Sequence, residues 1–234
     1  KKNYPFLIPQ PINHIKINLI TYSIIGFGVM GLLLAIGSSF DLYFSDLFYF
    51  GKKQFLLQST NWITIFFREI LIPFSLVYML FLPIISFKLP IKKLFFNYNF
   101  SSSNVFLIWV YLSVNLVLVV NVLLKGMWGR ARPNDVLQFG GSDIFTPWYL
   151  FSESCSKNCS FVSGDASVGF SVLILYLITK KTIYFYIAVV FGSLLGLIRI
   201  AEGGHFLSDV VFSFIITALT SIIVFYLFKK NYGQ

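Results

Sequence analysis

Long apolar runs are the feature that most constrains what this chain can fold into. A helix needs about 20 mostly apolar residues to cross a bilayer. Six segments come close to that length, at residues 17–36, 63–87, 104–124, 166–179, 183–198 and 208–228. Because a helix satisfies its own backbone hydrogen bonds in lipid, the pattern predicts an all-α, polytopic membrane protein. We expect a bundle of six transmembrane helices in which residues 1–234 form one domain.

The composition excludes an ordinary soluble protein. Hydrophobic residues make up 57% of the chain and charged residues 12%, whereas soluble domains average about 45–50% and 25%. The net charge of +9 would suit nucleic acid only on a soluble basic surface, which this chain hardly has. We therefore expect no nucleic-acid partner and assign the positive charge to the lipid interfaces.

The distribution of basic residues predicts the orientation. With six spans, both termini and the loops after the second and fourth spans lie on one side, together with His14. The lysines on that side are Lys1, Lys2, Lys16, Lys88, Lys92, Lys93, Lys180, Lys181, Lys229 and Lys230. No acidic residue accompanies them, and cytoplasmic loops are enriched in Lys and Arg. We expect both termini in the cytoplasm and the opposite loops outside it.

Three polar patches interrupt the outward ends of the spans. They read KGMWGRARP at 125–133, SFVSGDAS at 160–167 and RIAEGGHFLSD at 199–209. Gly203 and Gly204 predict a chain break that places His205 in the first turn of the sixth span, with Asp209 one turn on and on the same face. Asp209 would then accept a hydrogen bond from one imidazole nitrogen and leave the other free as a nucleophile.

The other two patches supply groups that favour an anion. Lys125, Arg132 and Arg199 are cationic donors, and a helix that begins at Ser163 and Gly164 offers backbone N–H groups. Each has an ordinary alternative, because Lys and Arg snorkel at helix ends and Ser caps helices. If the three patches meet in one pocket, that pocket suits a phosphate.

The spacing of these residues resembles a known signature. Three separated groups of residues together resemble the tripartite signature of the type 2 phosphatidic acid phosphatase superfamily. The first group is Lys125 followed after six residues by Arg132-Pro133, and the second is Ser163-Gly164. The third is Arg199, followed after five residues by His205 and after three more by Asp209. The resemblance implies a phosphomonoesterase that works without metal or cofactor, in which His205 attacks phosphorus and Asp209 orients it. The phosphoryl oxygens would be bound by Lys125, Arg132, Ser163, Gly164 and Arg199.

Asp165 departs from the family pattern, which usually has a histidine after Ser-Gly that protonates the leaving alkoxide. A carboxyl group is normally ionised near pH 7, and neighbouring cations keep it so. Asp165 is therefore a doubtful catalytic acid. The alternatives are protonation when a dianionic phosphate docks, the ordering of a water or of a cationic partner, and an engineered inactivating substitution.

The stretch CSKNCSFVSGDASVGF at 155–170 resembles bacterial lipid A phosphatases of the 4′ type, with the 1-phosphatases a close alternative. This resemblance implies a lipid substrate, lipid A or another phospholipid, and an inner-membrane enzyme with a periplasmic site. Rival substrates are undecaprenyl diphosphate and phosphatidylglycerol phosphate. A rival from another class is a non-catalytic transporter or lipid-binding protein whose charges line a pathway. The sequence leaves the oligomeric state open.

Further residues on the outward side have two interpretations each. Outside the cytoplasm, Cys155 and Cys159 favour a small disulfide ring over two free thiols, and they have no second Cys or His pair to complete a metal site. Arg130 and Glu202 either contact a sugar headgroup or are solvated. Residues 37–62 resemble an interfacial amphipathic helix that braces the site or only connects two spans. Trp128, Trp148 and Tyr149 line a lipid entrance or form an aromatic belt.

Overall fold

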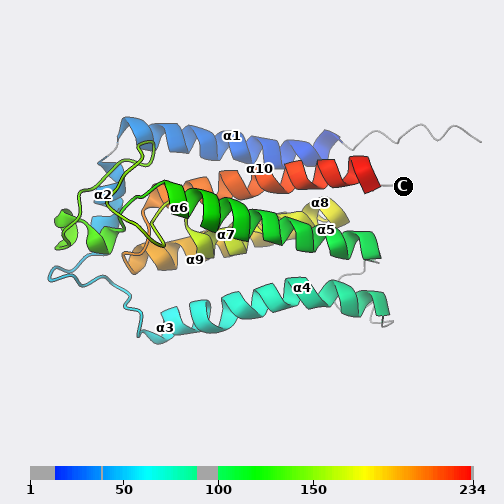
Figure 1. Ribbon diagram of the computed structural model, residues 1–234, viewed down its shortest axis with the longest axis horizontal. Coiled ribbons are helices and arrows are strands. Elements are labelled where there is room, and N and C mark those ends of the chain that lie inside the picture. The colour runs from blue at the N-terminus through cyan, green and yellow to red at the C-terminus, as the bar shows by residue number, and fades with distance from the viewer. Residues whose placement is uncertain (1–13, 38, 89–99, 233–234) are drawn as a thin grey trace, which may run out of the picture.

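The computed structural model describes residues 14–37, 39–88 and 100–232 (Figure 1). Over these residues the chain is helical and contains no β-strand. The longer elements are α1 (His14–Ile36), α4 (Ile72–Lys88), α5 (Ser102–Leu112), η3 (Ser113–Leu124), α9 (Thr182–Ala201) and α10 (Leu207–Tyr232). The shorter ones are α2 (Phe40–Asp46), α3 (Trp62–Ile65), η1 (Phe66–Leu71), α6 (Lys125–Met127), η4 (Pro133–Asp135), η5 (Leu137–Phe139), α7 (Gly164–Phe170) and α8 (Leu173–Thr179). The predicted all-α class is confirmed.

Five helices are long and apolar enough to cross a membrane. They are Leu19–Ile36, Trp62–Phe81, Ser102–Met127, Thr182–Ala201 and Leu207–Lys230. The second and third are continuous through π-helical segments, η1 and η3. The remaining predicted span is the shorter apolar helix pair Gly164–Thr179. The polytopic membrane architecture is confirmed, and the number of six spans stays a prediction.

The long helices run along the long axis of the molecule, and most of the irregular residues that the structure describes gather at one end (Figure 1). Figure 1 shows α2 and the loops around it at the left, and the C-terminal end of α10 at the right. The interfacial helix predicted over 37–62 is much shorter, because α2 covers only Phe40–Asp46 and the chain from 47 to 61 is irregular. Four lysines used for the predicted orientation, Lys1, Lys2, Lys92 and Lys93, lie outside the described residues.

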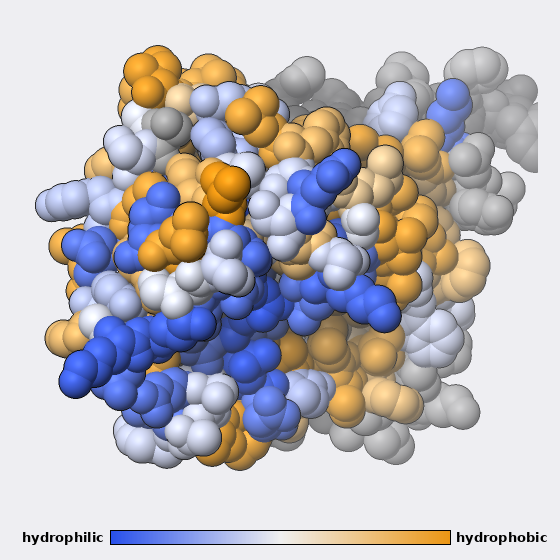
Figure 2. Space-filling model, turned by 60° about the vertical axis from the view of Figure 1, so that its left-hand side comes forward, coloured by the Kyte–Doolittle hydropathy of each residue, from blue (hydrophilic) through white to orange (hydrophobic). Residues whose placement is uncertain are grey.

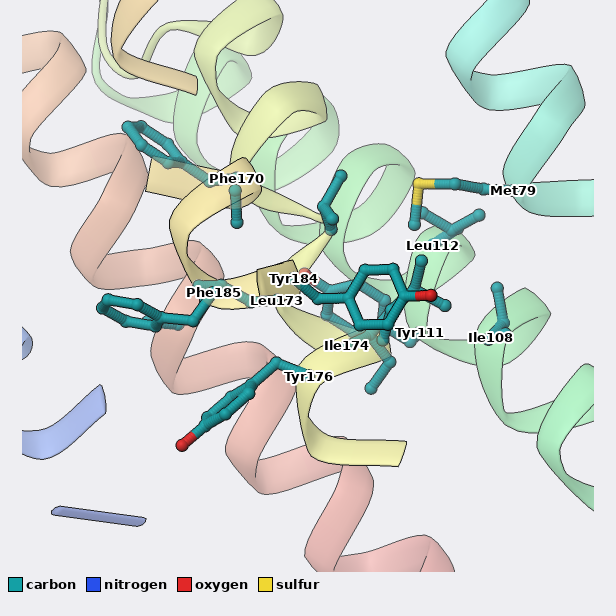
Figure 3. Close-up of a cluster of buried hydrophobic side chains, with 14 of the residues drawn as sticks. Met79, Ile108, Tyr111, Leu112, Phe170, Leu173, Ile174, Tyr176, Tyr184 and Phe185 are labelled. Carbon is teal, nitrogen blue, oxygen red and sulfur yellow. The ribbon is translucent and has the colours of Figure 1, made fainter. Parts of the chain in front are cut away.

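The main core forms where α4, α5, α8, α9 and α10 meet. Figure 3 shows Met79, Leu112 and Ile174 among its side chains, and all three are buried. Helices α7 and α9 approach each other closely, since a Cβ atom on Gly169 would lie 2.5 Å from the Cα of Gly192. Such contacts between small residues are how membrane helices pack without a hydrophobic driving force. The close packing fixes the position of α7, whose first residues belong to the polar end of the molecule.

Candidate active site

The three polar patches of the sequence lie together at the end of the bundle that carries the loops. Lys125 begins α6, Gly164 begins α7, and Arg199 lies in the last turn of α9. His205 precedes α10 by two residues, so its predicted place inside the first helical turn is wrong, whereas Asp209 is in that turn. The short connection from α9 to α10 brings Arg199 and His205 to the same region because it turns at Gly203, which has a φ of +67°.

Asp209 is held in one orientation by several donors. Its Oδ2 accepts hydrogen bonds from the hydroxyl of Ser160 at 2.5 Å and from the backbone N–H of Phe206 at 2.8 Å. Its Oδ1 accepts from Nη1 of Arg130 at 2.6 Å. Nδ1 of His205 lies 3.6 Å from Oδ2, which is close but longer than a hydrogen bond. The carboxylate is therefore fixed beside the imidazole, and a small approach of the ring would complete the predicted hydrogen bond.

Arg130 is a buried structural cation. Its side chain is 0% exposed, and its guanidinium contacts Asp209 and Oδ2 of Asp41 at 2.8 Å. Asp41 also accepts hydrogen bonds from the backbone and the hydroxyl of Ser208. Burial opposes the charge of Arg130, but the carboxylates of Asp209 and Asp41 outweigh it and raise the pKa of the guanidinium. Both interpretations of Arg130 from the sequence, sugar contact and solvation, are wrong.

His205 is enclosed by protein, with 2% of its surface exposed. Burial lowers the pKa of His205 to about 4, Asp209 opposes this shift, and the charges of Arg199 and Lys125 add to it. An imidazole with such a pKa is neutral near pH 7 and retains a free electron pair on one ring nitrogen. The site thus holds histidine in the form that a nucleophile requires.

Lys125 and Arg132 are held by one asparagine. Nζ of Lys125 donates to Oδ1 of Asn158 at 3.1 Å, and Nη2 of Arg132 donates to the backbone carbonyl of Asn158 at 2.7 Å. Asn158 adopts a left-handed conformation, with a φ of +51°. It lies in the five-residue ring closed by a disulfide between Cys155 and Cys159. The ring therefore connects directly to two of the predicted phosphate-binding cations.

At the start of α7 and in the turn before α10, the main chain lies close to the side chains of Lys125 and Arg199. Ser163 is the N-cap of α7, and its hydroxyl accepts from the N–H of Ala166. A Cβ on Gly164 would lie 3.2 Å from Nζ of Lys125, and one on Gly204 would lie 2.4 Å from Nη2 of Arg199. Glycine at these two positions lets the cations lie against the chain, and it places Lys125 at the start of α7.

Asp165 is paired with two arginines. Its Oδ2 lies 3.2 Å from Nε of Arg68 and 3.3 Å from Nε of Arg199. Glu202 pairs with Nη1 of Arg199, and its Oε1 lies 3.9 Å from Nη1 of Arg68. Glu202 is buried in these contacts, so the interpretation of this residue as a solvated side chain is wrong. Asp165 has the cationic partners that the sequence allowed as one alternative.

A polar cavity of about 420 Å³ opens beside these residues. Its walls include Arg68, Arg132, Arg199, Glu202 and Gly204, the residue directly before His205. The other side of the cavity is formed by the irregular segment between α2 and α3, through Phe55 and residues 57–60. Figure 2 shows hydrophilic residues gathered over this end of the molecule, with hydrophobic residues around them. The cavity has the charge and size to accept an anionic headgroup.

The aromatic residues near the site differ in exposure. Trp128 stacks on Phe161, and Trp148 packs against Phe212, so both tryptophans face the protein. Tyr149 is exposed.

Within the described part of the chain, no group of three or more His, Cys, Asp or Glu side chains is placed to hold a metal ion.

Sequence reasoning missed several residues that the fold brings to the site. Arg68 was not singled out, although the charged pair Arg68-Glu69 inside an otherwise apolar run was a signal for it. Asp41, Ser160 and Asn158 carried no recognisable spacing relative to the signature. Their roles come from contacts across the fold, with Asp41 and Ser208 separated by 167 positions in the chain.

Comparison with known proteins agrees with this geometry. The family model of the PAP2 superfamily matches residues 106–232. A lipid A 4′-phosphatase of Francisella tularensis subsp. novicida (strain U112) is 39% identical over 209 residues, which cover 82% of this chain and 88% of that protein. Proteins of the same name from Rhizobium leguminosarum and Rhizobium etli (strain ATCC 51251 / DSM 11541 / JCM 21823 / NBRC 15573 / CFN 42) are 37% and 38% identical over 117 residues, about half of each chain.

No solved structure matches the chain. The family match spans more than half of the sequence and contains Lys125, Arg132, Ser163, Gly164, Arg199, His205 and Asp209. A non-catalytic transporter or lipid-binding protein, the rival from another class, is therefore not retained. The chain belongs to the PAP2 superfamily and is a phosphoric monoester hydrolase.

Proposed function

We propose that this protein is a lipid phosphatase of the bacterial inner membrane that removes the 4′-phosphate of lipid A, with residues 1–234 acting as one catalytic domain. The observation that carries the proposal is the meeting of a buried, neutral His205 with Asp209 and three cationic residues at one end of the bundle. The choice of lipid A and of the 4′ position is supported by the names of the relatives.

In the proposed mechanism His205 attacks phosphorus through Nε2 while Nδ1–H points to Asp209. The new N–P bond forms as the bond from phosphorus to the sugar oxygen breaks, and that oxygen takes up a proton from a water molecule. Water then attacks the phosphohistidine, which releases inorganic phosphate and restores the imidazole. Both transfers pass through states with charge spread over the phosphoryl oxygens.

The phosphoryl oxygens would be bound by Lys125, Arg132 and Arg199, by the N–H of Gly164 and by the hydroxyl of Ser163, whose own N–H donates to the backbone carbonyl of Asp209. The contacts with Asn158 hold Lys125 and Arg132 in place before the substrate arrives, so these two donors stabilise the transition state with little reorganisation. Each lost donor of this kind typically costs about 10²–10³ in rate. We assign Asp165 to the site as a carboxylate that orders arginines, since it can serve as the acid only after leaving its two partners.

Mass spectrometry of lipid A tests the substrate. Cells of a Gram-negative host that express the protein should lose one phosphate from the distal glucosamine of lipid A, and cells with the His205→Ala variant should retain it. Loss of phosphate from the reducing-end sugar would instead assign the 1 position. Unchanged lipid A in cells that contain the folded protein would exclude lipid A as the substrate.

Rapid quenching tests the covalent step. Wild-type protein mixed with ³²P-labelled substrate should yield acid-labile, base-stable phosphoprotein, and His205→Ala should yield none. The His14→Ala variant is the matched control, because the sequence has only these two histidines. Label that persists in His205→Ala would contradict the assignment of the nucleophile.

Undecaprenyl diphosphate is a second candidate substrate, and the pairing of Asp165 with Arg68 and Arg199 favours it. Attack on a lipid diphosphate expels a phosphate group as the leaving group. This group needs less protonation than an alkoxide does, so the reaction depends less on a general acid. Parallel assays of the purified protein on both lipids separate the candidates. Turnover of the diphosphate alone would replace lipid A in the proposal.

The proposed orientation places both termini in the cytoplasm and the active site at the periplasmic face. Lys180 and Lys181 form the turn between α8 and α9, and Lys229 and Lys230 lie in the last turn of α10. These described lysines belong to the helix ends opposite His205. The excess of Lys on this side supports a cytoplasmic position.

A further inference from the structure

Four charged side chains, three of which line the cavity, alternate in sign and form a closed ring. Asp165 lies between Arg68 and Arg199, and Glu202 contacts the same two arginines from the other side. Three members of the ring come from residues that the family model matches. Arg68 lies outside the matched residues 106–232 and comes from the second long helix. This part of the site is therefore supplied by a helix that the family signature does not describe.

The backbone at Arg68 departs from regular α-helical geometry. It belongs to η1, a π-helical segment that interrupts the helix Trp62–Lys88. Such segments are rare and occur mainly as single wide turns within α-helices, often at functional sites. The Arg68 side chain is 33% exposed and lines the cavity with Arg132 and Arg199. It therefore reaches the space into which a phosphate would bind.

The ring creates a competition for Arg199. Two carboxylates, from Asp165 and Glu202, already contact its guanidinium. A phosphate that binds Arg199 must share or displace these contacts. Asp165 contacts Arg68 at a distance similar to its distance from Arg199, so a carboxylate released by Arg199 keeps a cationic partner. Without Arg68, Asp165 would have only Arg199 in this ring, and its negative charge would oppose an incoming phosphate.

We propose that Arg68 is a positioning residue for the phosphate site: it holds Asp165 and offsets its charge, so that Arg199 is available to the phosphoryl oxygens. The inference rests on the proposed function in that it assigns Arg199 to phosphate. It explains how a carboxylate can occupy the position directly after Ser163 and Gly164 in a site that binds an anion.

Binding of inorganic phosphate, a product of the proposed reaction, tests this role without relying on turnover. Isothermal titration of the purified protein in detergent should show about tenfold weaker phosphate binding for Arg68→Gln. We expect tenfold and not a hundredfold, because a partly exposed ion pair contributes less than a buried oxyanion donor. Lys52→Gln is the matched control, since it removes the same charge from an exposed position outside the cavity and should bind phosphate as the wild type does.

The double variant Arg68→Gln/Asp165→Asn distinguishes positioning from direct binding and from misfolding. If Arg68 acts through Asp165, removing the carboxylate should restore phosphate affinity to within about threefold of the wild type. A restored double variant is also a folded one. Affinity that stays low in the double variant, or an Arg68→Gln variant that binds phosphate as the wild type does, would overturn the proposal.

The same measurements separate this inference from the proposed function. If phosphate binding is weaker in Arg68→Gln than in the wild type but the wild type leaves lipid A unchanged, the substrate assignment is overturned and the inference is supported. Wild-type protein that removes the 4′-phosphate, with phosphate binding independent of Arg68, would support the function and overturn the inference. Wild-type protein that binds no phosphate would overturn the inference, and the lipid A measurement alone would then decide the function.

Discussion

At the scale of single residues, His205 has an environment far from that of a histidine in water. Burial lowers its pKa to about 4 from the ordinary 6.5. Because the folded protein binds this proton less readily than the unfolded chain, the unfolded state carries more protons between these two pH values. Stability therefore falls as the pH is lowered through this window, and the contribution vanishes above about pH 6.5.

The prediction is that His205 titrates with a midpoint near 4. The His14→Gln variant, labelled with ¹⁵N-histidine, contains a single histidine, so its NMR signal reports His205 alone. The unlabelled wild type and the variant should have equal phosphatase activity, which controls for the substitution. A midpoint near the ordinary value of 6.5 would show that His205 is open to solvent.

Asp41 is the second residue whose surroundings lead to a prediction. Its carboxylate pairs with the buried Arg130 guanidinium, which also holds Asp209. Removing one partner of a buried ion pair typically costs about 3–5 kcal/mol. Asp41→Asn should therefore lower the thermal unfolding midpoint in detergent and reduce activity, since Arg130 orients the partner of His205. Asp46→Asn, an exposed change in the same helix, is the control. Equal midpoints for the two variants would contradict the role of Asp41.

At the scale of elements, the disulfide ring between Cys155 and Cys159 and the helix after it work as one unit. The ring presents Asn158 to Lys125 and Arg132, Ser160 contacts Asp209, and Ser163 caps α7. Opening the ring frees the chain at Asn158 and so releases both cations from a fixed position.

We predict that reduction of this disulfide raises KM about tenfold, the equivalent of one hydrogen bond to a charged group. The measurement is the activity of the protein after treatment with a phosphine reductant. The double variant Cys155→Ser/Cys159→Ser should start at the higher KM and show no response to the reductant. An unchanged KM in reduced wild-type protein would mean that packing alone holds Asn158 in place.

At the scale of the whole molecule, the helical bundle separates a polar catalytic end from an end rich in lysine. The loops and the cavity lie at one end, and the C-terminal end of α10 lies at the other (Figure 1). A green fluorescent protein fused after Gln234 should fluoresce, because this protein folds in the cytoplasm and the C-terminus is predicted to lie there. Alkaline phosphatase fused at the same place should be inactive. The opposite pair of results would reverse the proposed orientation.

The sequence by itself determined the helices and the signature. Apolar runs placed the spans to within a few residues, as in α9, which covers Thr182–Ala201 where 183–198 was expected. Lengths and hydropathy are local properties, so they can be read along the chain. The spacing of Lys125, Arg132, Arg199, His205 and Asp209 identified the family for the same reason.

Only the tertiary structure decided how these residues are supported. Three sets of contacts join segments that are far apart in sequence. Arg130 is buried between Asp41 and Asp209, Arg68 contacts Asp165, and Asn158 contacts two cations. Charge in a polar patch looks the same in sequence whether it faces solvent or a buried partner. The partner is chosen by helix packing, such as the close approach of Gly169 to Gly192 that fixes α7, and this packing acts across the whole fold.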